Sequence, residues 1–209
     1  MKILFVKPLF LPEIKVIRFA RFDDTRGYFT ELYRESDFFS HPEMQFMKGY
    51  QFHQINESYS QKGTVRGLHF QWNPMQGKLI RTIMGHMIDL ILDIRKNSPT
   101  RGKIIAYDIP SHPEDTYQDW IWIPPGFAHG NFFPEPTTIQ YLCTAEYSPG
   151  YEAGISPFAT DIDWSACDVQ LKQQFDTLRE TPSITDKDKN GYTMNSWFKT
   201  ETSNLYTIQ

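Results

Sequence analysis

The chain has 209 residues, 40% of them apolar and 15% aromatic, which is enough for a packed core. Its 21 basic and 25 acidic residues give a formal net charge of −4, so the composition argues against a nucleic-acid-binding surface. Cys143 and Cys167 are too few for a disulfide framework or a thiolate metal site, so we expect both to be inert thiols. No apolar stretch is long enough for a leader or a membrane span, so we expect a cytoplasmic protein without membrane contact.

Short runs rich in Ile, Val, Tyr, Phe and Thr recur between Gly, Pro and Asn residues over the first 165 positions. Apolar and polar residues alternate within these runs and helical spacing is scarce, a combination that is typical of β-sandwiches and β-barrels. In chain order, the pattern predicts strands at residues 15–22, 28–33, 52–60, 104–109, 120–123 and 137–147.

The clearest local unit covers residues 79–94, where two β-type runs flank Met84, Gly85 and His86. A glycine between two such runs is typical of a tight turn. We therefore predict a β-hairpin with its turn at Gly85.

The composition changes after Trp164, and residues 168–180 carry apolar side chains at helical spacings. This segment is predicted to form a helix that packs on the barrel. No internal repeat or low-complexity linker divides the chain. We therefore predict a single domain over residues 1–209, with a core at about 13–165 and a C-terminal helical extension at 166–209.

Polar residues gather among apolar ones in residues 66–71 (Arg-Gly-Leu-His-Phe-Gln). Side chains alternate along a strand, so a strand here would turn His69 and Gln71 to one face and Arg66 to the other. Such a face would line a cavity inside a barrel. We expect further polar groups in the same cavity from Gln54, Asn56 and His129.

Six motifs follow one another along the chain: residues 22–31, residues 54–56, residues 66–71 with Lys78, residues 93–95 with 98–100, residues 126–130, and Tyr141 with Tyr147. In order and spacing they resemble the dTDP-4-dehydrorhamnose 3,5-epimerase family, over roughly Glu13 to Trp164. The resemblance implies an all-β double-stranded β-helix, that is, a jelly-roll or cupin barrel. It also implies an enzyme of deoxysugar biosynthesis that uses no metal or other cofactor and inverts C3, C5 or both of a nucleotide-diphosphate 4-keto-6-deoxyhexose.

Three residues receive catalytic roles from this resemblance: His69 as general base, Tyr141 as proton donor on the opposite face, and Lys78 as stabiliser of the enolate oxygen. The side chains suit these roles. A neutral imidazole can remove a proton from a carbon next to a ketone, and a phenol keeps its proton until an enolate takes it. A fixed ammonium stabilises negative charge on the former carbonyl oxygen.

The family also pairs its base with a carboxylate that holds the imidazole. Asp188 is the closest match here, but an insertion precedes it and Asp186 is an equal candidate. Both therefore stay open at this stage.

The remaining residues that match the family are implied in substrate binding. Arg26, Gln54, Asn56, Arg66 and His129 would surround the sugar and the diphosphate, because guanidinium groups suit phosphate oxygens. Phe29, Glu31 and Tyr147 would meet the nucleoside. In a homodimer with exchanged N-terminal strands, the partner subunit would supply Arg26, Phe29 and Glu31.

Two other classes of function fit these residues less well. A metal-dependent cupin needs several converging ligands, but Gln71 stands two positions after His69 and the chain has no His-x-His pair. A non-catalytic sugar-nucleotide-binding cupin would not need His69, Lys78 and Tyr141 together. A single-centre 3-epimerase or a 3,4-ketoisomerase would use the same enolate chemistry and stays open. Two departures from the family pattern, residues 156–158 (Ser-Pro-Phe) and Asn131, concern substrate identity more than reaction type.

Overall fold

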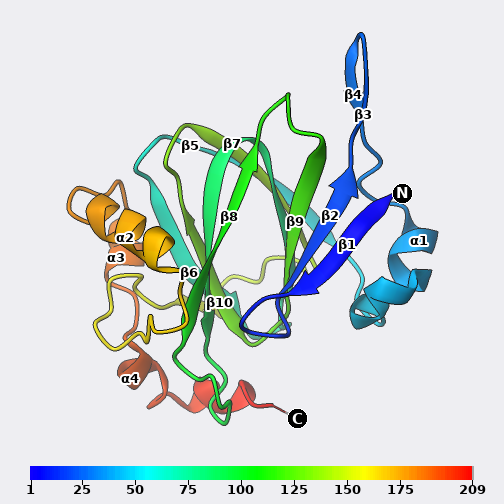
Figure 1. Ribbon diagram of the computed structural model, residues 1–209. Coiled ribbons are helices and arrows are strands. Elements are labelled where there is room, and N and C mark those ends of the chain that lie inside the picture. Colours follow the sequence, from blue (N-terminus) through cyan, green and yellow to red (C-terminus); the bar gives the residue numbers. More distant parts are fainter. Residues whose placement is uncertain (209) are drawn as a thin grey trace.

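Ten antiparallel strands form one continuous sheet that curls into a barrel in the computed structural model, which describes residues 1–208 (Figure 1). One half contains, in spatial order, β1 (Ile3–Pro8), β2 (Lys15–Ala20), β9 (Tyr117–Ile123), the first part of β7 (Lys78–Asp93), β11 (Thr137–Cys143) and β5 (Gln54–Ser60). The other half contains β8 (Ile104–Ser111), the rest of β7, β10 (Phe127–Phe132), β6 (Val65–Gln71) and β12 (Glu152–Gly154). The expected all-β jelly-roll barrel is confirmed.

The remaining elements lie outside the barrel. A separate hairpin of β3 (Phe22–Asp24) and β4 (Gly27–Phe29) protrudes from the body (Figure 1). It is followed by α1 (Glu35–Ser40) and the 3-10 helix η1 (Pro42–Met47). The C-terminal segment contains α2 (Val169–Leu178), α3 (Asp186–Lys189), α4 (Met194–Trp197) and the 3-10 helix η2 (Glu201–Leu205), and this agrees with the expected helical extension. Across residues 1–208, no helix has the length and apolar character needed to cross a membrane.

The predicted hairpin at Gly85 is wrong, because β7 is one strand of 16 residues. Gly85 lies where β7 passes from one half of the barrel to the other, and it has a φ of +98°. A Cβ there would lie 2.5 Å from the carbonyl oxygen of Pro136 and 2.8 Å from Thr137 Oγ1. The glycine therefore allows a bend and a close approach within a continuous strand instead of a chain reversal.

Replacing Gly85 with Ala is expected to lower the free energy of unfolding by about 2–4 kcal/mol, because the methyl group adds a collision to an unfavourable φ. Gly63 is a matched control, since it also has a positive φ, +82°, but a Cβ there would meet nothing within 4 Å. Urea unfolding should therefore separate the two alanine variants. Equal losses would show that the collision with Pro136 and Thr137 contributes nothing.

Most other predicted strands exist, with shifted ends. The segment 28–33 is strand only as far as Phe29, and the segment 137–147 ends at Cys143. The pattern missed β1, whose apolar run stops at Lys7 and Pro8, and the short strand β12. It also missed β10, which is buried along its whole length and therefore does not alternate.

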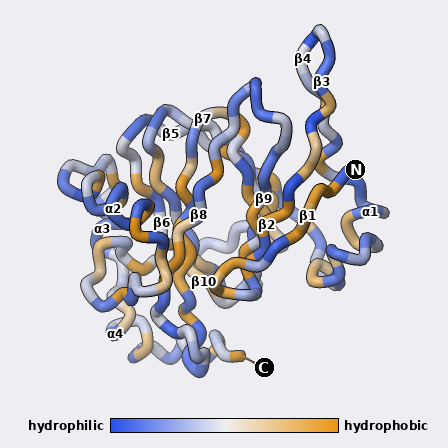
Figure 2. Tube along the Cα trace, in the orientation of Figure 1, coloured by the Kyte–Doolittle hydropathy of each residue, from blue (hydrophilic) through white to orange (hydrophobic). Residues whose placement is uncertain are grey.

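Apolar residues concentrate along the barrel strands, and the C-terminal segment packs onto them (Figure 2). The predicted helix is α2, which begins after its N-cap Asp168. Phe175 from α2 packs on Phe132 of β10 at 5.6 Å between ring centroids, and Trp197 from α4 packs on Phe70 of β6 at 4.6 Å. This shared core supports the expectation of one domain, which stays a prediction.

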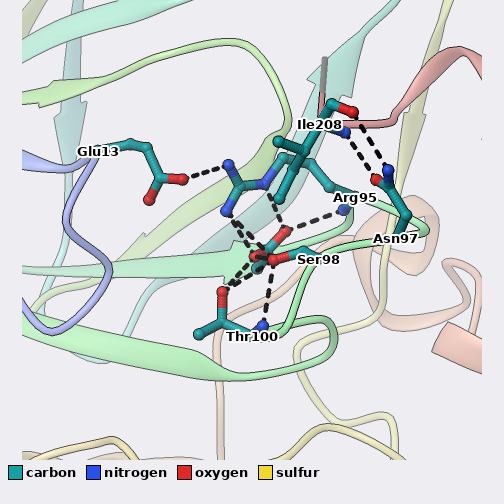
Figure 3. A network of polar contacts seen from close by, with 7 residues as sticks. Glu13, Arg95, Asn97, Ser98, Thr100 and Ile208 are labelled. Carbon is teal, nitrogen blue, oxygen red and sulfur yellow. Dashed lines mark hydrogen bonds and ion pairs between the residues drawn. The ribbon is translucent and has the colours of Figure 1, made fainter.

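A largely buried polar network lies at the end of β7 and in the loop that follows it (Figure 3). The carboxylate of Asp93 accepts hydrogen bonds from the Arg95 guanidinium and from the hydroxyls of Ser98 and Thr100, both at 2.6 Å. Burial raises the pKa of Asp93, but these donors outweigh it and the pKa lies below its ordinary value. Arg95 also contacts Glu13, so the network ties the loop after β7 to the N-terminal part of the chain.

Candidate active site

Two adjoining cavities lie inside the barrel, and His69, Lys78 and Tyr141 line both of them. The larger cavity has a volume of about 370 Å³ and the smaller cavity about 190 Å³. The sequence therefore identified three side chains from three different strands that meet at one place. The predicted residues Gln54, Asn56 and Tyr147 line the larger cavity, and Arg66, His129 and Asp188 line the smaller cavity.

The prediction that Arg66 faces away from His69 is wrong, since both line the smaller cavity. The pairing of β6 with β10 shifts register between His129 and Asn131, so two steps along β10 span three along β6. A bulge of this kind reverses the alternation of side chains. It is centred on Gly67, where φ is +101° and a Cβ would lie 2.6 Å from the backbone of Gly130.

His69 is held by a carboxylate, and the structure selects Asp188 over Asp186. His69 Nε2 lies 2.7 Å from Asp188 Oδ1, and the backbone N–H of Gly67 donates to Asp188 Oδ2 at 3.1 Å. Asp188 is 7% exposed, whereas Asp186 is exposed. Burial raises the pKa of Asp188, but the bonds to His69 and Gly67 act more strongly and hold it below its ordinary value.

The negative charge on Asp188 determines which ring nitrogen of His69 carries the hydrogen. An ionised carboxylate can only accept a hydrogen bond, so His69 Nε2 carries the hydrogen and Nδ1 keeps its lone pair. Within residues 1–208, Nδ1 makes no hydrogen bond. His69 is therefore arranged to accept a proton at Nδ1.

The C-terminal extension carries Asp188 to the site. Asp188 lies on α3, where Thr185 caps the helix by accepting a hydrogen bond from the Asp188 N–H at 3.2 Å. Ser156 Oγ donates to the Lys189 carbonyl at 2.8 Å, and the Tyr192 N–H donates to the carbonyl of Gly154 in β12 at 2.8 Å. Because β12 pairs with β6, these bonds fix Asp188 relative to the strand that carries His69.

Lys78 stands at the start of β7, and among residues 1–208 only burial and more distant charges, with no hydrogen bond, act on its ammonium. Burial lowers the pKa of Lys78, although Cys143 and Asp89 nearby act in the opposite direction. A desolvated ammonium without a partner is a strong electrostatic site for an anionic oxygen.

Tyr141 lines both cavities, and His129 lines the smaller one. Burial raises the pKa of Tyr141, so its phenol stays protonated at neutral pH. His129 Nε2 lies 2.6 Å from Asp89 Oδ1, and both side chains are buried. Burial raises the pKa of Asp89 and lowers that of His129. His129 thus reaches the cavity, but one of its ring nitrogens is already bound to protein.

A chain of polar contacts borders the larger cavity. Gln54 donates to Asn56 Oδ1 at 2.9 Å and accepts from the Tyr147 N–H at 2.7 Å. The Tyr147 hydroxyl donates to Glu152 at 3.0 Å, and the Lys187 ammonium donates to the same carboxylate at 2.7 Å. Glu152 lines the cavity, but as a single carboxylate after a loop it gave no signal in the sequence.

Arg26, Phe29 and Glu31 do not line either cavity of their own chain. They belong to the protruding hairpin and the segment after it (Figure 1). The side chain of Arg26 is 87% exposed and pairs with Asp24, and Phe29 is 67% exposed. Glu31 instead pairs with the N-terminal amine and Arg34.

Among residues 1–208, no group of three or more His, Cys, Asp and Glu side chains is arranged to hold a metal ion. His69 and His129 pair in register across β6 and β10, but each already bonds a carboxylate of its own.

Comparison of the chain with known proteins shows which family it belongs to. The family model described as dTDP-4-dehydrorhamnose 3,5-epimerase matches residues 8–196. The chain belongs to this family. It is therefore an epimerase, an enzyme of the isomerase class.

Individual relatives agree with this family. The chain is 40% identical to a dTDP-4-dehydrorhamnose 3,5-epimerase from Sinorhizobium fredii, over 87% of this chain and 90% of that one. It is similar to the structure of a dTDP-6-deoxy-D-glucose-3,5-epimerase from Legionella pneumophila in complex with dTDP-4-keto-L-rhamnose, with 27% identity, 98% coverage of both chains and a TM-score of 0.80. A 3'-monoepimerase from Streptomyces bikiniensis in complex with dTDP-quinovose shares the fold, with 22% identity, 92% and 89% coverage and a TM-score of 0.74.

Proposed function

We propose that this epimerase inverts C3 and C5 of a dTDP-linked 4-keto-6-deoxyhexose through an enolate, and that the reaction takes place between the two cavities. The convergence of His69, Lys78 and Tyr141 on both cavities carries this proposal. The ligand of the Legionella relative supports the class of substrate.

In the first step, His69 Nδ1 removes the proton from a carbon next to the ketone. The electron pair of that C–H bond becomes the carbon–carbon double bond, and the carbonyl π pair moves onto oxygen. Asp188 stabilises the imidazolium that forms. The ammonium of Lys78 stabilises the oxygen, which carries most of the new charge.

In the second step, Tyr141 donates its phenolic proton to the opposite face of the same carbon, so the configuration inverts. His69 then holds the removed proton and Tyr141 is a phenolate, and proton exchange with water restores both. C3 and C5 both flank the C4 ketone, so the same oxygen and the same lysine serve both inversions. An enzyme that inverts one centre uses the same steps, and the shared fold of the Streptomyces monoepimerase does not decide between them.

The nucleotide end of the substrate is proposed to lie toward the larger cavity. Gln54 and Asn56 of the larger cavity, with Arg66 of the smaller one, would meet the sugar and diphosphate. The exposed ring of Tyr147 would meet the base. His129 is proposed to contact the sugar from the smaller cavity.

A second copy of the chain is proposed to complete the site, in a homodimer with exchanged N-terminal strands. The protruding hairpin supports this arrangement because it leaves the aromatic side chains of Phe22, Tyr28 and Phe29 exposed. Arg26, Phe29 and Glu31 would then reach the partner's larger cavity. We also propose that the protein acts in the cytoplasm, as one folded domain per chain.

The proposal is tested with a panel of nucleotide-linked 4-keto-6-deoxyhexoses in deuterated water, with C3 and C5 followed by NMR. The dTDP sugar is expected to gain deuterium at both carbons and to change configuration there. A lack of exchange with every member of the panel would instead support a binding protein without catalysis.

The same assay tests the expectation that no metal takes part. Turnover should be unchanged after treatment with EDTA, because the proposed steps use only side chains of the protein. Activity that disappears with EDTA and returns with iron or zinc would contradict the mechanism.

A further inference from the structure

Asn131 is a polar side chain in the wall of the smaller cavity to which the proposed reaction gives no role. It lies on β10 two residues after His129, so both side chains face the cavity, while Phe132 points into the apolar core. In the sheet it stands between Arg66 of β6 and Asp89 of β7. It is only 3% exposed.

The amide oxygen of Asn131 lacks a hydrogen-bond donor. Within residues 1–208, Oδ1 of Asn131 is buried and has no partner. The amide group acts as a donor toward the adjacent Asp89, because a hydrogen bond from the Asn131 side chain acts to lower the pKa of Asp89 against the effect of burial. Buried acceptors are almost always paired, because an unpaired one has lost its water without replacement. An unpaired acceptor on a residue of the cavity wall indicates that a donor enters from the cavity when the site is occupied.

Apart from the hydroxyl of Ser58, the other polar groups of this cavity have partners or another role. Arg66 donates to Ser60 Oγ and to the Tyr59 carbonyl, and His129 bonds Asp89. The ammonium of Lys78 and the guanidinium of Arg66 can only donate hydrogen bonds, so neither can accept one from a hydroxyl group of the ligand. Asn131 therefore offers a neutral acceptor to a hydroxyl hydrogen.

The position of the Asn131 amide oxygen suits contact with the sugar part of the substrate. The smaller cavity shares His69, Lys78 and Tyr141 with the larger one, so Asn131 lines the same space as the reacting groups. A volume of about 190 Å³ is room for roughly six water molecules, which suits part of a sugar ring better than a single trapped water. The free hydroxyl groups of a nucleotide-linked 4-keto-6-deoxyhexose are on C3, which is itself a reacting carbon, and on C2, which is bonded to it.

We propose that Asn131 determines specificity by accepting a hydrogen bond through Oδ1 from a ring hydroxyl, on C2 or C3, of the bound 4-keto sugar. This inference rests on the proposed function. A sugar without that hydroxyl leaves the buried oxygen unpaired in the complex, and the enzyme discriminates against it.

The test compares dTDP-4-keto-6-deoxyglucose with its 2-deoxy and 3-deoxy analogues, using wild type and Asn131→Leu. Deuterium uptake at C5 is the readout, because that carbon carries no hydroxyl in any of the three sugars. Wild type is expected to prefer the parent sugar over one analogue by about 10- to 100-fold in kcat/KM. Asn131→Leu should reduce that preference to within about threefold, because leucine has a similar size and no acceptor.

Ile139→Val is the matched control, since it removes one carbon from the wall of the same cavity without changing a polar group. It should keep the wild-type preference whatever its effect on rate. An unchanged preference in Asn131→Leu, or an equal loss on all three sugars, overturns the inference. If that variant does not fold, wild type alone decides: equal rates on the three sugars overturn it. A wild type that exchanges none of them contradicts the proposed function instead.

Discussion

Asp188→Asn is expected to lower turnover by about 10²- to 10⁴-fold, with a much smaller effect on substrate affinity. The carboxylate can only accept a hydrogen bond from His69 Nε2, and this keeps the lone pair on Nδ1. An amide can also donate, so it stabilises the other tautomer, with the hydrogen on the atom that has to take the proton. The amide also carries no charge to stabilise the imidazolium.

Asp186→Asn is the control, because it makes the same change two residues earlier on α3, where the side chain is exposed. It should retain wild-type turnover. Steady-state kinetics on both variants separates a specific role of Asp188 from a general effect of charge. Similar turnover in the two variants would contradict the role of Asp188.

Asp188→Asn is also expected to lower the stability of the folded protein. The folded pKa of Asp188 lies below its ordinary value, so its contribution to stability is present above about pH 4 and is lost as the pH falls through the folded pKa. Asp188→Asn should therefore be less stable than wild type at neutral pH. The difference should shrink on acidification, as measured by urea unfolding between pH 7 and pH 3.

Lys78→Met is expected to lower turnover by about 10²- to 10³-fold, while affinity changes less, because charge on the ketone oxygen develops only as the enolate forms. The protein should at the same time become more stable. Burial lowers the pKa of Lys78, so its charged form is less stable in the folded protein than in water, and methionine removes the cost of burying that charge at similar volume.

Lys62→Met is the matched control, since Lys62 is exposed in the loop after β5, and it should change neither property. Turnover, KM and the midpoint of thermal unfolding are measured for both variants. Nearly wild-type turnover with poor affinity in Lys78→Met would make this lysine a phosphate contact.

Local patterns predicted the class of fold and most strands, because alternation is a property of short segments. They failed where distant parts of the chain decide the geometry. Gly85 has the positive φ that a turn would need, but its close neighbours Pro136 and Thr137 lie some fifty residues later, and the strand bends without reversing. Arg66 changes face because Gly67 packs on Gly130 from another strand.

The site was predictable to the extent that residue types and motifs carry chemistry. His69, Lys78 and Tyr141 were found in this way, and the structure places them together. The choice between Asp188 and Asp186 depends on which side of a four-residue helix faces a strand more than 100 residues earlier. The family resemblance made Asp188 the closest match but left Asp186 an equal candidate. Asn131 stood out only as a departure from the family pattern, and its unpaired oxygen is a property of the folded barrel.

The most direct test of the enolate mechanism is Tyr141→Phe in deuterated water, with exchange and inversion measured on the same sample by NMR. This variant keeps His69, so it should still remove the proton, form the enolate and return label to the original face. We expect deuterium in the substrate with retained configuration, at a rate well above that of inversion, whereas His69→Ala should lose both processes. If folded Tyr141→Phe inverts the sugar at the wild-type rate, or if exchange and inversion fall in parallel, Tyr141 is not the proton donor and the two-sided mechanism is contradicted.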